Sequence, residues 1–389
     1  MNLGGWGLSP SATEVELALT RFFAREVFGL PEGSGGIITS GGAMATFVAL
    51  KAARDHRAGW DVRDRGVAAG PQLGLYLSTE THVVSDRAAD MLGIGRANVR
   101  HVPVDRRFRM RVDELEAAIA RDRGAGIRPF AVVGTAGTVS TGAVDPLGEI
   151  ADLCEREGLW FHVDAAYGGP AMLAPDLRPL FDGIERADSI AFDPHKWLST
   201  PLTGGCVLLR DASLLPASFD ADPAYVRQDR ELTRAGVDLG RWGPQFSRGF
   251  WALKVWVSLL AHGRAAYARR ISHDAELARY LGRRVVEHPA FELACPVGLS
   301  ICCFRYAPPD LPEGPGRDAY LDRMNERLMT EIQLDGRAFI SNAVLDGRFF
   351  LRVCIVNFRT EAEDLDAVLA VAEELGARLD AELRPEELR

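Results

Sequence analysis

The chain has 389 residues, of which 47% are hydrophobic and 25% are charged, a composition typical of globular proteins and unlike that of disordered or collagen-like chains. Its length exceeds the size at which a single hydrophobic core usually stops growing, so we expect a large domain and a smaller one. The formal net charge of −9 provides no basic field for phosphate backbones or anionic lipids. This argues against nucleic-acid and membrane partners and favours a small-molecule ligand.

The sequence also indicates a cellular compartment. It contains no run of the roughly 20 uninterrupted apolar residues that a membrane-spanning helix requires, and its first residues lack the basic and apolar regions of a secretory signal. The six cysteines show no Cys-x-x-Cys pair and no zinc-ligand spacing. We therefore expect a cytoplasmic protein with reduced thiols and no metal site.

From about residue 10 the chain alternates helical and β-rich patterns, which predicts an α/β architecture with a largely parallel sheet. Residues 11–28 repeat apolar side chains at helical spacing after capping-type residues, Ser11 followed by Glu14, and predict a helix. Short apolar runs flanked by turn residues predict buried strands at 73–78, 129–136, 158–165, 189–194 and 206–210.

The pattern changes in the second half of the chain. Residues 224–246 mix charges and glycines and predict an exposed loop. A helix is predicted at about 247–283 with a break at Gly263, followed by strands and helices of a second domain at 297–306, 316–334, 348–358 and 361–383. The Pro/Gly-rich run 307–316 predicts a loop within that domain. We therefore expect a large domain over residues 1–285 and a small α+β domain over residues 286–389.

Lys196 and Asp164 form the most informative pair. Lys196 follows a β-rich run in FDPHKWL, a heptapeptide that by itself fits a structural lysine equally well. Asp164 ends an apolar run in FHVDAAYGG, and a buried carboxylate is costly without a cation. A protonated pyridine nitrogen would supply that cation, and the small Ala166 would let a flat ring lie against the backbone. The pair predicts a site for pyridoxal 5′-phosphate (PLP).

Two further elements agree with this prediction. The segment ITSGGAMATFVALKAA places Gly42 and Ala43 at the start of an apolar helix, where small residues let backbone amides approach a phosphate. Glycines at a helix start also fit a simple turn. His82 lies between a predicted strand and the next helix, where a structural role is the alternative.

These motifs, together with SPSATEVE, GTAGTVSTGAVDPL, SRGFWALKVW and FLRVCIVNFRT, resemble the group II PLP-dependent decarboxylases, which include aromatic-L-amino-acid, glutamate and tyrosine decarboxylases. The resemblance covers nearly the whole chain, and HVDAAY with a downstream PHKW is its most specific part. It implies the fold-type I architecture of PLP-dependent transferases, with a mostly parallel seven-stranded sheet in the large domain and a small C-terminal α+β domain. It also implies decarboxylation of an L-amino acid to the corresponding amine and carbon dioxide.

The resemblance further implies roles for residues around the cofactor ring. Lys196 would hold PLP as an aldimine, and Asp164 would pair with the pyridinium nitrogen. His82 would stack on one face of the ring and act in catalysis, and Ala166 would pack on the other face.

Other implied roles concern the phosphate and the partner subunit. The backbone amides of Gly42 and Ala43 would bind the phosphate with His195 nearby, and Thr138 would lie beside the cofactor. In family members the segment after the lysine, here residues 198–205, reaches the neighbouring subunit's site. A homodimer with active sites at the subunit interface is therefore implied.

The sequence departs from the family at two positions. Aromatic decarboxylases have a loop tyrosine that protonates the substrate carbanion, whereas residues 227–242 contain no tyrosine and Tyr225 precedes them. Asp193 stands where aromatic relatives often have Asn, so we do not expect it to contact the phosphate unless the carboxyl group is neutralised. The missing tyrosine leaves a decarboxylating aldehyde synthase open, and an aminotransferase or a carbon–carbon lyase on the same fold is also an alternative. A non-catalytic PLP-binding protein is a further one.

Overall fold

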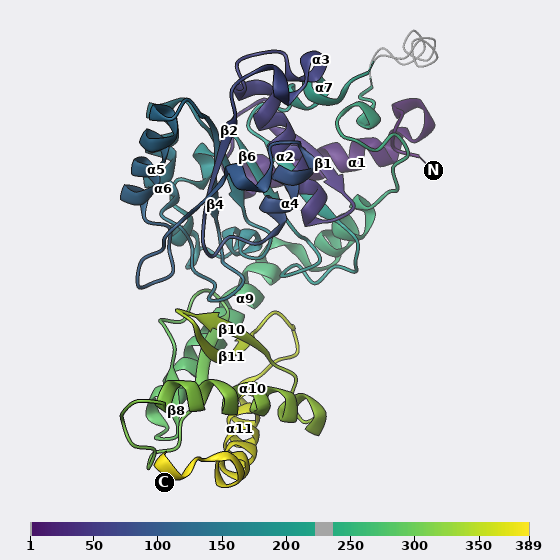
Figure 1. Cartoon of the computed structure of the whole chain (residues 1–389). Helices are drawn as coiled ribbons and strands as arrows, with labels where there is room; N and C mark the ends of the chain where they lie inside the picture. The colour runs from purple at the N-terminus through teal and green to yellow at the C-terminus, as the bar shows by residue number, and fades with distance from the viewer. Residues whose placement is uncertain (1, 222–235, 389) are drawn as a thin grey trace. The chain divides into compact units, whose positions relative to one another are not determined.

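The computed structural model describes residues 2–221 and 236–388 (Figure 1), so Tyr225 lies outside the described residues. The chain divides into two compact units, and the first contains residues 1–105, 109–136 and 144–268. The second contains residues 106–108, 137–143 and 269–389. The division falls within helix α9 (Ala252–Glu287). The expected boundary between residues 285 and 286 stays a prediction.

The first unit is built on a seven-stranded sheet with the order β1-β7-β6-β5-β4-β2-β3. Neighbouring strands from β3 to β6 are parallel, whereas β7 pairs antiparallel with both β6 and β1. The bounds are β1 Gly35–Thr39, β2 Leu73–Ser78, β3 Val99–Val102, β4 Arg128–Thr135, β5 Trp160–Asp164, β6 Ser189–Phe192 and β7 Gly205–Leu209. The sheet confirms the predicted fold class. The five strands expected in this unit lie within two residues of their predicted ends, and β1 and β3 were not predicted.

Helices cover this sheet because its strands are apolar on both faces: every residue of β2, β5 and β6 is buried. The bounds are α1 Pro10–Arg21, α2 Gly42–Arg57, α3 Val62–Arg65, α4 Val84–Met91, α5 Val112–Gly124, α6 Leu147–Glu157 and α7 Leu214–Phe219. Helix α2 packs against β6 and β7 through small residues such as Ala45 and Ala49, and α5 and α6 lie side by side (Figure 1).

The helix expected at 11–28 is present as α1 followed directly by a π-helical segment, Phe22–Val27, but the prediction that Ser11 caps it was wrong. Ser9 is the N-cap residue and Pro10 occupies the first turn, a position that suits the preset φ of proline. The Glu14 carboxylate accepts a hydrogen bond from Trp6 Nε1 at 3.0 Å instead of closing a capping box with Ser11.

The second unit has a four-stranded antiparallel sheet with the order β10-β11-β9-β8. The bounds are β8 Phe291–Leu293, β9 Ile301–Tyr306, β10 Ser341–Leu345, β11 Arg348–Cys354, α10 Arg317–Asp335 and α11 Ala362–Leu383. Both predicted helices are confirmed to within one residue, whereas β8 and β10 were missed. Helix α9 leaves helical geometry at Gly263 (φ 74°, ψ 158°), as expected. Within the described ranges, no helix is both long enough and apolar enough to cross a membrane.

Candidate functional site

Functional side chains gather at the carboxyl edge of the first unit's sheet. Asp164 is the last residue of β5, and Asp193 follows the end of β6 directly. The two strands are parallel, with Asp164 opposite Ala191, so both carboxylates emerge at the same edge. The backbone N–H of Asp193 donates to the carbonyl oxygen of Ala166 at 3.1 Å. This bond ties together the turns that follow the two strands, and this edge is where parallel α/β sheets usually bind ligands.

Lys196 lies at this edge, one turn after Asp193. Its Nζ atom is 3.2 Å from Oδ2 of Asp193. The chain contains only three lysines, Lys51, Lys196 and Lys254. Lys51 donates to Asp55 and to the carbonyl oxygen of Ser218, and Lys254 is on α9. Lys196 is therefore the lysine that the fold brings to the edge where β5 and β6 end.

The start of α2 approaches the same carboxylate because Gly42 has no side chain. A Cβ atom at Gly42 would lie 2.6 Å from Oδ2 of Asp193, and one at Gly205 would lie 2.3 Å from the carbonyl carbon of Gly41. The Thr39 hydroxyl lies within hydrogen-bond distance of the Gly41 and Gly205 carbonyl oxygens, at 2.9 and 3.1 Å. The first N–H groups of the helix have no intrahelical acceptor. Together with the helix dipole they can receive an anion here.

A carboxyl group such as that of Asp193 is unusual beside the start of α2, where an incoming anion is expected to bind. The residue is 4% exposed, and its Oδ1 atom has no hydrogen-bond partner among the described residues. Burial raises the pKa of its carboxyl group, although the charges of Lys196 and His195 act in the opposite direction. A raised pKa favours the neutral acid, which is the condition under which we expected Asp193 to tolerate a nearby phosphate.

Asp164 is buried without a cation. Its Oδ1 atom accepts a hydrogen bond from the backbone N–H of Ala166 at 3.0 Å, and it forms no ion pair within the described part of the chain. His162 does not compensate for this charge, because burial lowers the pKa of its imidazole to about 4. Trp160 Nε1 donates to Ser189 Oγ at 2.8 Å, which leaves the Ser189 hydroxyl free to donate to His162 Nδ1 at 2.9 Å. A neutral His162 therefore lies two residues before an uncompensated carboxylate.

The remaining predicted residues occupy different surroundings. His195 Nδ1 lies 2.8 Å from the carbonyl oxygen of Gly204, so it carries the proton, and its Nε2 atom is 3.8 Å from Asp193. His82 is exposed between β2 and α4 and accepts the backbone N–H of Val84 at 3.2 Å. Thr138 belongs to the second unit, where its hydroxyl lies 2.9 Å from that of Thr141. The role of Thr138 stays a prediction.

Sequence reasoning missed Thr39 and Gly205, which shape the turn before α2. The adjacent Gly204 and Gly205, immediately before an apolar run, were the signal available for this close approach.

The residues at this edge fit PLP. A primary amine is available at Lys196 for the cofactor aldehyde, and the start of α2 offers backbone amides to a phosphate. Asp164, a buried carboxylate that has no ion pair with any described residue, suits a protonated ring nitrogen.

Comparisons with known proteins agree with this chemistry. The pyridoxal-dependent decarboxylase conserved domain matches residues 2–307. An aromatic-L-amino-acid decarboxylase of Bacillus atrophaeus is 34% identical over 374 residues, which cover 95% of this chain and 75% of that protein. The acidic amino acid decarboxylase GADL1 of Homo sapiens is 34% identical over 356 residues, covering 90% and 68%. The structure of Oryza sativa TDC with PLP and tryptamine has a TM-score of 0.88 and 30% identity, covering 97% and 78%.

Proposed function

This chain belongs to the family of pyridoxal-dependent decarboxylases, and we propose that Lys196 carries PLP while the enzyme converts an L-amino acid into the corresponding amine and carbon dioxide. The PLP-dependent decarboxylation of an amino acid is the activity of the family. The observation that carries the assignment of Lys196 is its position at the carboxyl edge of the sheet, 3.2 Å from Asp193. Its Nζ atom is the primary amine beside the start of α2.

The chain's own residues would hold the two ends of the cofactor. The first backbone amides of α2, at Gly42 and Ala43, would bind the phosphate, with His195 close by. Asp164 would hold a proton on the ring nitrogen, because a buried carboxylate without an ion pair strongly favours a cation beside it. PLP, once bound, supplies the electron sink that accepts the pair of electrons from the bond to the departing carboxylate.

Two residues would orient the ring. Ala166 is small and follows Asp164 closely, so its side of the ring would pack against the backbone. His82 is exposed beyond β2 and would cover the other face, where an imidazole ring can stack. Thr138 would lie beside the cofactor, as the resemblance to the family implies.

We also propose that the protein is a homodimer with active sites at the subunit interface. Helix α9 exposes an apolar stripe at helical spacing, formed by Leu253, Trp256, Val257 and Leu260, which are 37–66% exposed. Leu202, in the segment after Lys196, is 75% exposed. Exposed apolar patches of this kind are typical of interaction surfaces, and a second copy of the chain would cover them. None of the described cysteines forms a disulfide, which is consistent with the cytoplasmic location that we also propose.

Reduction of the PLP-loaded protein with borohydride, followed by peptide mapping, tests the assignment of Lys196. Because the chain has three lysines, the reduced cofactor can label only three residues. We expect the label in the peptide that contains Lys196. Lys196→Ala should lose the yellow absorbance of the bound cofactor and carbon dioxide release, whereas Lys254→Ala should keep both. Label on Lys51 or Lys254 would contradict the assignment.

A carbon dioxide release assay over a panel of L-amino acids, with amine and α-keto acid quantified in parallel, tests the reaction and identifies the substrate. We expect one amine for each carbon dioxide. Stoichiometric aldehyde and peroxide, or keto acid without carbon dioxide, would support the alternative reactions instead.

A further inference from the structure

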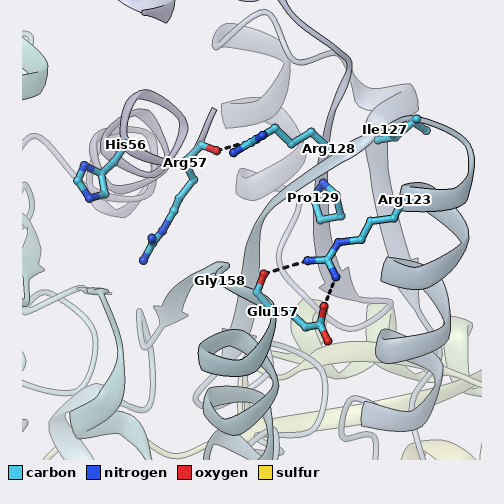
Figure 2. Close-up of a pocket in the computed structure, with 9 residues that line it drawn as sticks. His56, Arg57, Arg123, Ile127, Arg128, Pro129, Glu157 and Gly158 are labelled. Carbon is cyan, nitrogen blue, oxygen red and sulfur yellow. Dashed lines mark hydrogen bonds and ion pairs between the residues drawn. The ribbon is translucent and has the colours of Figure 1, made fainter. Parts of the chain in front are cut away.

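A second pocket lies at the opposite edge of the first unit's sheet, where β4 and β5 begin. It has a volume of about 490 Å³ and is lined by Arg57, Arg123, Arg128, Glu157 and His56, among others (Figure 2). Arg57 ends α2, Arg128 begins β4, and Glu157 ends α6 just before β5. Lys196 and Asp164 lie at the carboxyl ends of the strands, so this pocket is separate from the site described above.

The guanidinium group of Arg57 has no hydrogen-bond or ion-pair partner among the residues that the structure describes. Its Nε atom is buried from solvent and has no hydrogen-bond partner within the described residues, and Figure 2 marks no contact to the guanidinium group. Asp188 lies near enough for its carboxyl group to feel the charge of Arg57, but it accepts the backbone N–H of Phe161 at 2.8 Å and forms no ion pair with Arg57. A buried donor without an acceptor is costly, so an external acceptor would stabilise Arg57.

The charges of the pocket are not balanced from within. The carboxylate of Glu157 pairs with Arg123, which also donates to the Glu157 carbonyl oxygen at 2.9 Å. The Nε atom of Arg128 donates to the backbone carbonyl oxygen of Arg57 at 3.1 Å, which holds Arg128 beside the end of α2. Its terminal nitrogens form no ion pair with a carboxylate of the described residues. Among the residues that line the pocket, three arginines accompany one carboxylate, so the lining itself carries an excess of two positive charges, in a chain whose net charge is −9.

We propose that this pocket binds the phosphoryl group of a small phosphorylated molecule, with Arg57 and Arg128 as its principal ligands. A phosphate dianion matches the two uncompensated charges, and a planar guanidinium group can donate two parallel hydrogen bonds to phosphoryl oxygens. The carbonyl oxygen of Arg57, which accepts from Arg128, holds one guanidinium group in place before the anion arrives. The pocket volume leaves room for a molecule larger than a single phosphate group.

A series of contacts connects this pocket with the site at the carboxyl edge of the sheet. The His56 ring meets the Trp160 ring edge to face, with centroids 6.2 Å apart. Trp160 begins β5, which ends at Asp164, and its Nε1 atom donates to Ser189 at the start of β6. The binding proposal does not depend on this route.

Isothermal titration calorimetry of the full-length, PLP-saturated protein with inorganic pyrophosphate tests the proposal. Saturation with PLP occupies the phosphate position at α2, so the added anion reports on the second pocket. We expect one site per chain, binding that weakens as sodium chloride is added, and at least tenfold weaker binding to Arg57→Gln/Arg128→Gln. Arg121→Gln is the matched control, because Arg121 is exposed on α5, the helix that carries Arg123, and does not line the pocket; its affinity should equal that of the wild type.

Three results would overturn the proposal: no heat of binding in the wild type, equal affinity in the double variant, or tighter binding of malonate than of pyrophosphate. Circular dichroism of the double variant verifies that it is folded. Carbon dioxide release distinguishes the two proposals, because a protein that decarboxylates normally without binding pyrophosphate refutes only this one, and one that binds pyrophosphate without releasing carbon dioxide refutes only the function.

Discussion

The Nζ atom of Lys196 lies 3.2 Å from Oδ2 of Asp193, a carboxylate that also touches the start of α2 at Gly42. An ionised Asp193 would therefore repel an incoming phosphate, because both groups are negatively charged. Burial raises the pKa of Asp193, and this shift favours the neutral form. The protonation state of Asp193 should consequently control how well the site accepts an anion.

Asp193→Asn should remove a pH dependence of cofactor affinity. As the pH rises through the raised pKa of Asp193, the carboxyl group ionises and repels the phosphate, so the wild-type Kd for PLP should rise by up to about tenfold per pH unit. The amide cannot ionise, so the variant should bind PLP at least as tightly and lack this component. Fluorescence titration with PLP at several pH values measures it, and Asp90→Asn, at an exposed position on α4, is the control. If the ratio of the wild-type Kd to the Asp193→Asn Kd stayed the same across the pH range, this role of Asp193 would be contradicted.

His162 should make the protein less stable in mild acid. Burial lowers its pKa from 6.5 to about 4, so between these values the unfolded chain binds a proton that the folded chain excludes. Stability from this group is complete above pH 6.5 and is lost as the pH falls toward 4. Between pH 7.5 and 5.5 the loss should be about 1 kcal/mol.

Urea unfolding at the two pH values measures this effect in wild type, His162→Gln and His262→Gln. The first variant should lose the pH-dependent component, and the second should keep it because His262 is exposed on α9. Identical pH dependence in all three proteins would rule the explanation out.

The ion pair between Glu16 and Arg248 should be expensive to break. Both side chains are fully buried, and Arg248 also donates to the carbonyl oxygen of Ile38 in β1 at 2.8 Å. Removing one partner leaves a buried charge, so Glu16→Gln should lower the free energy of unfolding by about 3 kcal/mol. Glu16→Gln/Arg248→Met should cost less than the sum of the single changes.

Chemical denaturation of the wild type, Glu16→Gln, Arg248→Met and the double variant provides a double-mutant cycle for this ion pair. Arg156→Gln breaks an exposed pair with Glu116 and should cost less than about 1 kcal/mol. Equal losses in Glu16→Gln and Arg156→Gln would show that burial of the first pair contributes nothing.

Charges on the apolar stripe of α9 should prevent dimer formation. Val257→Glu/Leu260→Glu places two carboxylates on a surface that the proposed partner subunit would bury, which is costly without cations. Size-exclusion chromatography with light scattering should find the wild type as a dimer and the variant as a monomer. Leu180→Glu, at another exposed apolar position of the same unit, should leave the dimer intact. A monomeric wild type would refute the proposed dimer.

Sequence patterns predicted most elements because strands buried on both faces form continuous apolar runs and helices repeat apolar residues every three or four positions. Two strands of the same sheet were missed, each for its own reason. Strand β3 has four residues, of which only the first and the last are buried, so its pattern resembles that of a loop. Strand β1 begins with two glycines, a composition that does not favour strands.

For the candidate site too, the sequence determined one part and the tertiary structure another. The sequence by itself determined the chemistry, because Lys196, Asp164 and the glycines before α2 occur in an order that few other functions require. Tertiary structure alone decided that Asp193 contacts both Lys196 and Gly42, that Arg248 pairs with Glu16, and that Arg128 donates to the backbone carbonyl oxygen of Arg57. These contacts join positions up to 232 residues apart, and strand order, register and the absence of a side chain at Gly42 set their distances. Local periodicity cannot encode such distances, since it reports which face of an element is buried and not which residue lies opposite.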